Sequence, residues 1–229
     1  MLSYNHVKCD ACLQEGIGEV EIMKQILCFG DSNTYGLIPG TKDRFDWEIR
    51  WTGKIAKKLE GTDYRIVEEG LCGRTTIFDD PLRSGRRGTE LLPTILESHA
   101  PLEIVILMLG TNDCKAFYDA NAEVIGLGIE KLLDQIQKSQ PGLKVLLISP
   151  IHLGERVWEE GYDPEFNEVS VETSKNFSRV YERIAEKRKI AFVDAARYVK
   201  ASERDRAHLD EEGHERLAEA IWDRLEKML

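Results

Sequence analysis

Short apolar runs rich in branched residues alternate along this chain with longer amphipathic stretches. The runs in the middle of the chain show no apolar–polar alternation, which is typical of strands buried on both faces. Alternating strands and helical stretches predict parallel strands joined by crossover helices. The five candidate strands are Gln25–Gly30, Tyr64–Glu69, Glu103–Gly110, Lys144–Pro150 and Ile190–Ala195.

Apolar residues recur at helical spacing between the candidate strands. Such positions are Trp51, Ile55 and Leu59; Leu91, Leu92, Ile95 and Leu96; Ile129, Leu132, Leu133 and Ile136; and Phe177, Val180, Tyr181 and Ile184. A last helix is predicted over Glu212–Leu229. Together these elements predict an α/β fold, a three-layer α/β/α sandwich around a five-stranded parallel sheet. Ligands are expected at the carboxyl ends of its strands.

Residues 25–229 are predicted to form one domain, with no internal repeat or low-complexity segment. Residues 1–24 are weakly periodic and are interpreted as an N-terminal appendage. The irregular stretch Ile151–Glu168 follows the fourth candidate strand and carries Trp158, Tyr162 and Phe166. Long loops at the ligand edge of such a sheet often form substrate walls.

The composition is that of a soluble globular protein, with 42% hydrophobic and 31% charged residues among 229. No apolar run reaches the roughly 18 residues of a membrane span, and the first twenty residues do not resemble a secretory signal. The net charge of −10 disfavours nucleic acid and anionic lipid as partners. An odd number of cysteines, five, indicates free thiols in a reducing, cytoplasmic compartment. Homo-oligomerisation remains open.

A serine stands where the first candidate strand breaks into a polar turn, in Gly30-Asp31-Ser32-Asn33. Ser32 is therefore expected at the ligand edge. The alternative is that Asp31 and Ser32 only cap the next helix, because both residue types are favoured there. A serine hydroxyl becomes a useful nucleophile only when a base takes its proton, so the chemical interpretation requires a histidine and a group that orients it.

Asp205 and His208 stand three residues apart in a polar loop before the last helix. That spacing lets the carboxylate bond one imidazole nitrogen and leave the other free to act as a base. The alternative is a solvated charged loop. His152, which follows the fourth strand, is the competing candidate base, whereas His214 is interpreted as a helix-start or surface residue.

Two further strand ends carry donors for a developing oxyanion. Gly73 follows the second strand and can present its N–H without a side chain in the way, and the Asn112 amide follows the third. Glycine and asparagine are also usual turn residues, so each residue alone is weak evidence for an oxyanion site. The pair Cys9 and Cys12 could be half of a zinc site, but no second pair follows, so no metal is expected.

Taken together, the four segments resemble the SGNH hydrolases, also called the GDSL esterase/lipase family. The family is named for Ser, Gly, Asn and His in four blocks, and the acid of its last block precedes the histidine by three residues. The matching residues are Ser32, Gly73, Asn112 and His208, with Asp205 as the acid. The resemblance covers roughly Met23–Leu229 and implies the flavodoxin-like SGNH sandwich, and it adds Ser32 as an oxyanion donor beside Gly73 and Asn112.

Two positions depart from the family pattern. Asn33 stands where leucine is common, at a position that is not catalytic, and Arg206 stands where glycine is usual, which bears on loop geometry. Further segments look like the bacterial arylesterase/acyltransferase branch, whose members hydrolyse small activated esters and in part transfer the acyl group to alcohols. Those segments are Arg50-Trp51-Thr52-Gly53, Glu68-Glu69-Gly70-Leu71, Arg74-Thr75-Thr76, Asp79-Asp80-Pro81 and Met108-Leu109-Gly110-Thr111-Asn112-Asp113.

The sequence therefore predicts a serine carboxylic ester hydrolase that needs no cofactor, acts on small short-acyl or aryl esters and has a possible acyltransferase activity. Tyr35 and Trp158 are candidate substrate-binding residues. Because the 151–168 loop is acidic, a neutral ester is the expected substrate. Two alternatives remain: a carbohydrate O-deacetylase using the same site, and a non-catalytic flavodoxin-like binding module.

Overall fold

The computed structural model describes residues 23–229, and the predicted appendage lies outside the described residues except for Met23 and Lys24. Five strands form one parallel sheet in the order β2-β1-β3-β4-β5. They are β1 (Lys24–Gly30), β2 (Tyr64–Gly70), β3 (Ile104–Met108), β4 (Lys144–Ser149) and β5 (Ala191–Asp194). All five predicted strands are confirmed, with ends that differ by no more than two residues.

Helices connect the strands, and each stretch of helical periodicity corresponds to one of them, whereas the helices at residues 32–35 and 168–175 were not predicted. They are α1 (Ser32–Tyr35), α2 (Trp51–Lys58), α3 (Gly88–Ser98), α4 (Ala122–Ser139), α5 (Glu168–Lys175), α6 (Phe177–Arg188) and α7 (Glu211–Leu225), with short 3₁₀ turns η2 (Thr111–Cys114), η3 (Ala116–Tyr118) and η4 (Ala195–Arg197). The last helix starts one residue before its predicted start, because the Asp210 side chain caps it by accepting from Gly213 N at 2.8 Å, and it ends at Leu225 and not at the predicted Leu229.

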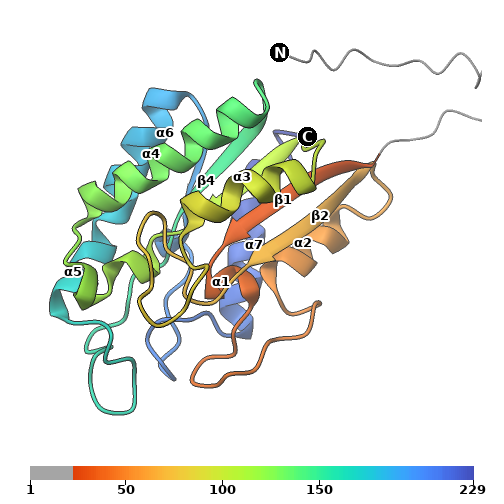
Figure 1. Ribbon diagram of the computed structural model, residues 1–229. Helices are drawn as coiled ribbons and strands as arrows, with labels where there is room; N and C mark the ends of the chain where they lie inside the picture. Colours follow the sequence, from red (N-terminus) through yellow and green to blue (C-terminus); the bar gives the residue numbers. More distant parts are fainter. Residues whose placement is uncertain (1–22) are drawn as a thin grey trace, which may run out of the picture.

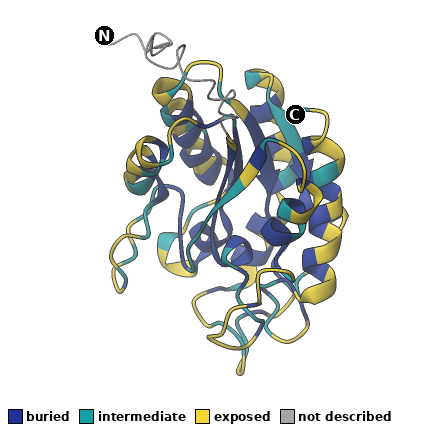
Figure 2. Ribbon diagram, turned by 90° about the vertical axis from the view of Figure 1, so that its right-hand side faces the viewer, coloured by how far each residue is buried: buried dark blue, intermediate teal, exposed yellow. Residues whose placement is uncertain are grey.

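Successive strand residues face opposite sides of the sheet and pack against different helices, which creates two cores (Figures 1 and 2). In β1, Leu27 and Phe29 join the core formed with α3, α4 and α6. Ile26 and Cys28 join the core formed with α2 and α7. The three-layer α/β/α prediction is therefore confirmed, and the strands lack polar alternation because both of their faces are covered.

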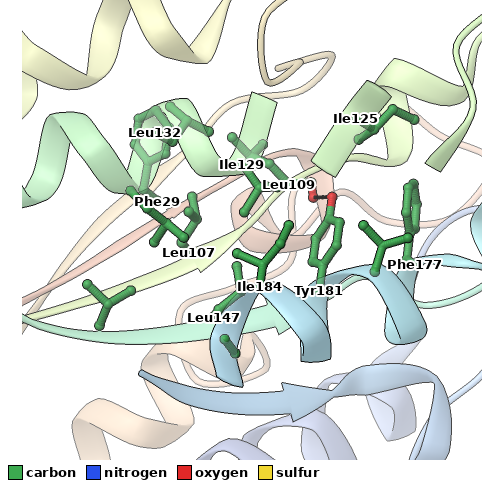
Figure 3. Packing of buried hydrophobic residues seen from close by; sticks show 14 of the residues in the cluster. Phe29, Leu107, Leu109, Ile125, Ile129, Leu132, Leu147, Phe177, Tyr181 and Ile184 are labelled. Carbon is green, nitrogen blue, oxygen red and sulfur yellow. Dashed lines mark hydrogen bonds between the residues drawn. The ribbon is translucent and has the colours of Figure 1, made fainter. Parts of the chain in front are cut away.

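One buried hydroxyl links the helical layer to the end of β3. Tyr181, on α6, lies among the apolar residues of the first core and donates from its hydroxyl to the Leu109 carbonyl at 2.8 Å (Figure 3). The next residue, Gly110, has a φ of +134°, and a Cβ there would meet the Tyr181 hydroxyl at 2.4 Å. Only glycine suits that position, so the chain can turn away from the core immediately after β3.

The loops that follow the strands gather at one end of the sheet, at the bottom of Figure 1. Since β1 lies between β2 and β3, the turns after these three strands are neighbours. Ligands bind at this edge in open parallel sheets, where the strand order reverses direction. No helix within residues 23–229 has the length and apolarity needed to cross a membrane.

The close approach of β2 to the turn after β1 provides a test of this arrangement. A Cβ on Gly70 would meet the backbone nitrogen of Tyr35 at 2.2 Å, and backbone cannot move aside as a flexible side chain can. Gly70→Ala should therefore lower the free energy of unfolding by about 1–3 kcal/mol in urea titrations. Gly213→Ala is the control, because its new Cβ would meet only side-chain atoms, the nearest being Leu209 Cδ2 at 3.1 Å, and a leucine side chain can shift by a few tenths of an ångström. Equal unfolding midpoints for Gly70→Ala and the parent would contradict this packing.

Candidate active site

Ser32 is the first residue of the short helix α1, directly after β1. Asp31 caps that helix, since its Oδ1 accepts from Asn33 N at 3.0 Å. The capping interpretation therefore holds for Asp31. The Ser32 side chain is free for another role, and its Oγ lies 2.9 Å from Nε2 of His208.

Asp205 completes a hydrogen-bond chain through His208 to Ser32. The Asp205 Oδ2 lies 2.7 Å from Nδ1 of His208, on the opposite side of the ring from Ser32. Both side chains are mostly buried, with relative exposures of 18% for His208 and 14% for Asp205. Because a carboxylate can only accept, it holds the Nδ1 proton and leaves Nε2 as the basic atom facing the serine.

Asp205 remains ionised in this environment. Burial raises the pKa of Asp205, but the hydrogen bond and charge of His208 and the backbone N–H donors of Ala207 and His208 together outweigh burial, and the pKa falls to about 2. The Asp205 Oδ1 also accepts from the backbone N–H groups of Ala207 and His208 at 3.1 and 3.0 Å. Gly40 N donates to Oδ2 at 2.9 Å from the loop after α1. These bonds explain how three-residue spacing brings the acid to the imidazole.

Asn33 contacts the histidine turn, a role that the sequence did not indicate. Its Nδ2 donates to the Ala207 carbonyl at 3.3 Å, and its Oδ1 accepts from Leu209 N at 3.0 Å. The two bonds flank His208 on either side, and the Asn33 side chain is buried. The only signal available in the sequence was the departure from leucine at this position.

Arg206 adopts a left-handed backbone conformation, with a φ of +62°. A glycine would adopt it without strain, and a residue with a Cβ pays roughly 1–2 kcal/mol. The Arg206 guanidinium donates to the carbonyls of Glu155 and Arg156 and lies 4.1 Å from the ring centre of Tyr162. Gly154 N donates to the Arg206 carbonyl at 2.7 Å. The departure from glycine therefore joins the histidine turn to the 151–168 loop.

Gly73 and Asn112 lie at adjoining turns. Asn112 is buried, and its Nδ2 donates to the Arg74 carbonyl at 3.2 Å, which leaves one amide N–H for another acceptor. Gly73 has a φ of +82°. Within residues 23–229, the backbone N–H groups of Ser32 and Gly73 donate to no acceptor. The turns thus carry three donors that can serve a ligand atom.

A buried carboxyl supports the Asn112 turn. Asp113 is fully buried and accepts from Thr76 N at 2.9 Å and from Thr76 Oγ1 at 2.5 Å. Burial raises its pKa to about 7, and the charge of Asp31 adds to the effect. Burial also raises the pKa of Asp31, to about 6. The Thr76–Asp113 contact holds the turns after β2 and β3 together.

The other histidines take different positions. His152 is partly buried, and within residues 23–229 its ring makes no hydrogen bond, so His208 and not His152 faces Ser32. His214 lies in the first turn of α7, which is the first of the two positions predicted for it, and the alternative of a surface position does not hold, because its side chain is completely buried. Its Nδ1 accepts from Trp51 N at 3.3 Å, and burial lowers its pKa to about 4.

The candidate substrate-binding aromatics occupy distinct surroundings. Tyr35 ends α1, and the Arg44 guanidinium lies 4.1 Å from its ring centre. Trp158 is partly buried and packs against the first core, whereas Phe166 is buried within that core. Tyr162 stacks with Arg206. The 151–168 loop also reaches the Asn112 side, because Ala116 N donates to the Glu165 carbonyl at 2.8 Å.

No three His, Cys, Asp or Glu side chains gather as a metal site in the described range, 23–229. Cys9 and Cys12, the candidate half of a zinc site, lie outside the described residues.

Comparison with known families gives a match over most of the chain. The profile of the GDSL-like lipase/acylhydrolase family matches residues 28–216, a range that includes Ser32 and His208. Among curated proteins, none matches this chain significantly.

Solved structures of esterases are similar to the whole described domain. An inhibitor-bound aryl esterase from M. Smegmatis is 35% identical, with a TM-score of 0.84 over 90% of this chain and 100% of that chain. A carbohydrate acetylesterase from Sinorhizobium meliloti is 37% identical, with a TM-score of 0.83 over 90% and 100% of the two chains. A second carbohydrate acetylesterase family member from the same organism is 31% identical, with a TM-score of 0.82 over 90% and 99%.

The raised pKa of Asp113 predicts a pH-dependent stability. An unfolded aspartate titrates near 3.8, so between about pH 4 and pH 7 the folded state binds more protons than the unfolded state. The stabilisation from protonated Asp113 is fully present below about pH 4 and is lost as the pH rises through about 7. In Asp113→Asn the amide cannot ionise, so the free energy of unfolding of this variant, relative to the parent, should rise between pH 5 and pH 8.

Urea titrations at the two pH values measure this difference. Asp223→Asn removes one exposed carboxylate from α7 and is the control. A difference between Asp113→Asn and the parent that stays constant over this range would show that Asp113 is ionised throughout.

Proposed function

Because this chain belongs to the GDSL-like lipase/acylhydrolase family, the SGNH hydrolases, it is an ester hydrolase, and we propose that it cleaves small short-acyl or aryl esters through an acyl-enzyme on Ser32. The observation that carries this proposal is the chain of hydrogen bonds from Asp205 through His208 to Ser32, at 2.7 and 2.9 Å. A non-catalytic binding module does not require this arrangement.

In the proposed reaction, Ser32 Oγ attacks the ester carbonyl while His208 Nε2 accepts the hydroxyl proton. His208 then donates that proton to the oxygen of the leaving alcohol as the carbon–oxygen bond breaks. Water attacks the acyl-enzyme in the second half, with His208 again accepting the proton, and the acid leaves as Ser32 recovers its hydroxyl. Asp205, kept ionised, stabilises the imidazolium that forms twice in each cycle.

The oxyanion of each tetrahedral intermediate would be bound by Ser32 N–H, Gly73 N–H and the remaining amide N–H of Asn112. This proposal is supported by the availability of these N–H groups. Neither backbone N–H has an acceptor within residues 23–229, and the Asn112 amide donates only one of its two hydrogens, to the Arg74 carbonyl. Donors that are fixed before the reaction stabilise developing charge without reorganising.

A small neutral ester remains our proposed substrate. The acidic character of the 151–168 loop supports this proposal less than its composition suggests, since three of its carboxylates form ion pairs. Glu155 pairs with Lys175, Glu159 with Arg156 and Glu165 with Lys115. The net charge of −10 still opposes the approach of anions.

A carbohydrate O-deacetylase is the second candidate function, and the similarity to carbohydrate acetylesterases favours it. Its chemistry at Ser32 would be the same. Catalytic efficiencies on p-nitrophenyl acetate and on acetylated sugars separate the two functions. An efficiency on acetylated sugars well above that on aryl acetates would replace the first proposal by the second.

The proposed roles predict the kinetics of four variants. Ser32→Ala and His208→Ala should each lower ester turnover by several orders of magnitude, because the residues act as one unit. Asp205→Asn should also be severe, since an amide can hold the wrong imidazole tautomer. His152→Ala is the control and should be much milder. A dispensable His208 together with an indispensable His152 would show that the base is assigned wrongly.

Acyl transfer depends on how an alcohol competes with water for the acyl-enzyme. We propose that Trp158 is part of an apolar wall that desolvates the site, and that the enzyme transfers short acyl groups to an added primary alcohol in mostly aqueous buffer. Trp158→Ala should lower the ratio of ester to acid among the products, measured by chromatography. Tyr198→Ala, an exposed aromatic outside the 151–168 loop, is the control. An unchanged ratio in Trp158→Ala would remove Trp158 from the pocket, and a parent that forms no transfer product would be a plain esterase.

A further inference from the structure

The turn that carries His208 is stabilised by two kinds of hydrogen bond. Bonds within the turn shape it: the Asp205 carboxylate accepts from the backbone N–H groups of Ala207 and His208, and Ser202 N donates to the His208 carbonyl at 2.8 Å. These contacts connect residues that are close in sequence. They leave the Ala207 carbonyl and the Leu209 N–H, one on each side of His208, to be paired from elsewhere.

Asn33 supplies both of those remaining partners. Its amide donates to the Ala207 carbonyl at 3.3 Å and accepts from the Leu209 N–H at 3.0 Å, across 174 and 176 positions of the sequence. A carbonyl on one side and an N–H on the other determine the orientation of the amide. Among side chains of this length, an amide offers a donor and an acceptor together at every pH, whereas a carboxyl does so only while it is protonated.

The Asn33 backbone is itself held firmly on the nucleophile turn. Its N–H donates to the Asp31 side chain at 3.0 Å, and its carbonyl accepts from the Trp51 indole at 3.1 Å. Only 4% of Asn33 is exposed, so water does not replace its partners. Asn33 therefore connects the residue next to Ser32 with the residues on both sides of His208.

We propose that Asn33 is a positioning residue, whose side-chain amide sets the distance between Ser32 Oγ and His208 Nε2. Within residues 23–229 its side chain hydrogen-bonds neither to Ser32 Oγ nor to the imidazole, and it acts through the backbone of the histidine turn. A leucine could fill the space but would leave the Ala207 carbonyl and the Leu209 N–H buried without partners, which is costly. In this chain the first block therefore provides both the nucleophile and the support of its base.

The inference rests on the proposed function for its kinetic test, and Asn33→Leu provides that test. Proton transfer by His208 occurs in acylation and deacylation, while contacts with the substrate are unchanged. The variant should therefore show a kcat on p-nitrophenyl acetate that is about tenfold lower or more, with a KM within about twofold of the parent. Asn33→Asp, once ionised, keeps the acceptor for Leu209 N–H and loses the donor to Ala207, so its kcat should lie between the two.

Thr34→Val is the matched control. Thr34 is the next residue of the same helix and is completely buried, and within residues 23–229 its hydroxyl has no hydrogen-bond partner. Valine has nearly the same shape, so this variant should retain kcat and KM within about twofold. Equal losses of kcat in Thr34→Val and Asn33→Leu would overturn the proposal, because any disturbance of α1 would then have the same effect. An Asn33→Leu variant with the kcat of the parent would also overturn it.

Hydrogen exchange tests the same contact without relying on esterase activity. The Leu209 amide should exchange faster in Asn33→Leu than in the parent and Thr34→Val, whereas amides of α4 should be unchanged. Unaltered exchange at Leu209 overturns the proposal whether or not the protein hydrolyses esters. A parent that cleaves no ester, combined with faster exchange in the variant, would reject the proposed function and leave the structural role of Asn33 intact. If Asn33→Leu does not fold, Asn33→Ala, which removes both hydrogen bonds, is measured in both assays, and parent values in both would overturn the proposal.

Discussion

The candidate site depends on one contact between distant parts of the chain, the 2.9 Å hydrogen bond between Ser32 Oγ and His208 Nε2. The sheet makes this contact possible. Because β1 lies between β2 and β3 in a parallel sheet, the turns after these two strands flank the turn that carries Ser32. His208 belongs to the segment that leads into α7. Contacts of its own turn must therefore hold it next to Ser32.

Those contacts come from three directions. Asn33 binds the histidine turn from the nucleophile side, Gly40 N–H binds Asp205 from the loop after α1, and Arg206 binds the 151–168 loop. Each of these contacts involves backbone polar groups, which must be paired once they leave water. The position of the base is thus a consequence of satisfying the backbone of the turn, and the imidazole follows the backbone that carries it.

Three carboxyl groups with shifted pKa values lie at the same edge of the sheet. Asp31 and Asp113 are completely buried, and burial raises the pKa of each. Asp205 is partly buried, and its pKa falls because His208 and two backbone N–H groups donate to it. Asp205 differs from them in its partners and also in its shallower burial. A carboxyl opposite an imidazole stays charged and can stabilise an imidazolium, whereas Asp113, opposite Thr76, can hold the Asn112 turn as a neutral group.

Local patterns in the sequence determined the strands, the helices and the order of the four site turns. Two-sided burial makes a strand apolar throughout, and a serine, glycine or asparagine directly after such a strand must lie at its carboxyl end. The contact between Asp205 and His208 could also be predicted from their spacing, because both residues belong to one short turn. Features that depend on contacts between distant segments were decided only by the tertiary structure. The burial of His214 against Trp51, the left-handed backbone of Arg206 and the pairing of Asn33 with the histidine turn have no periodic or local signal, since each arises where segments far apart in the sequence pack together.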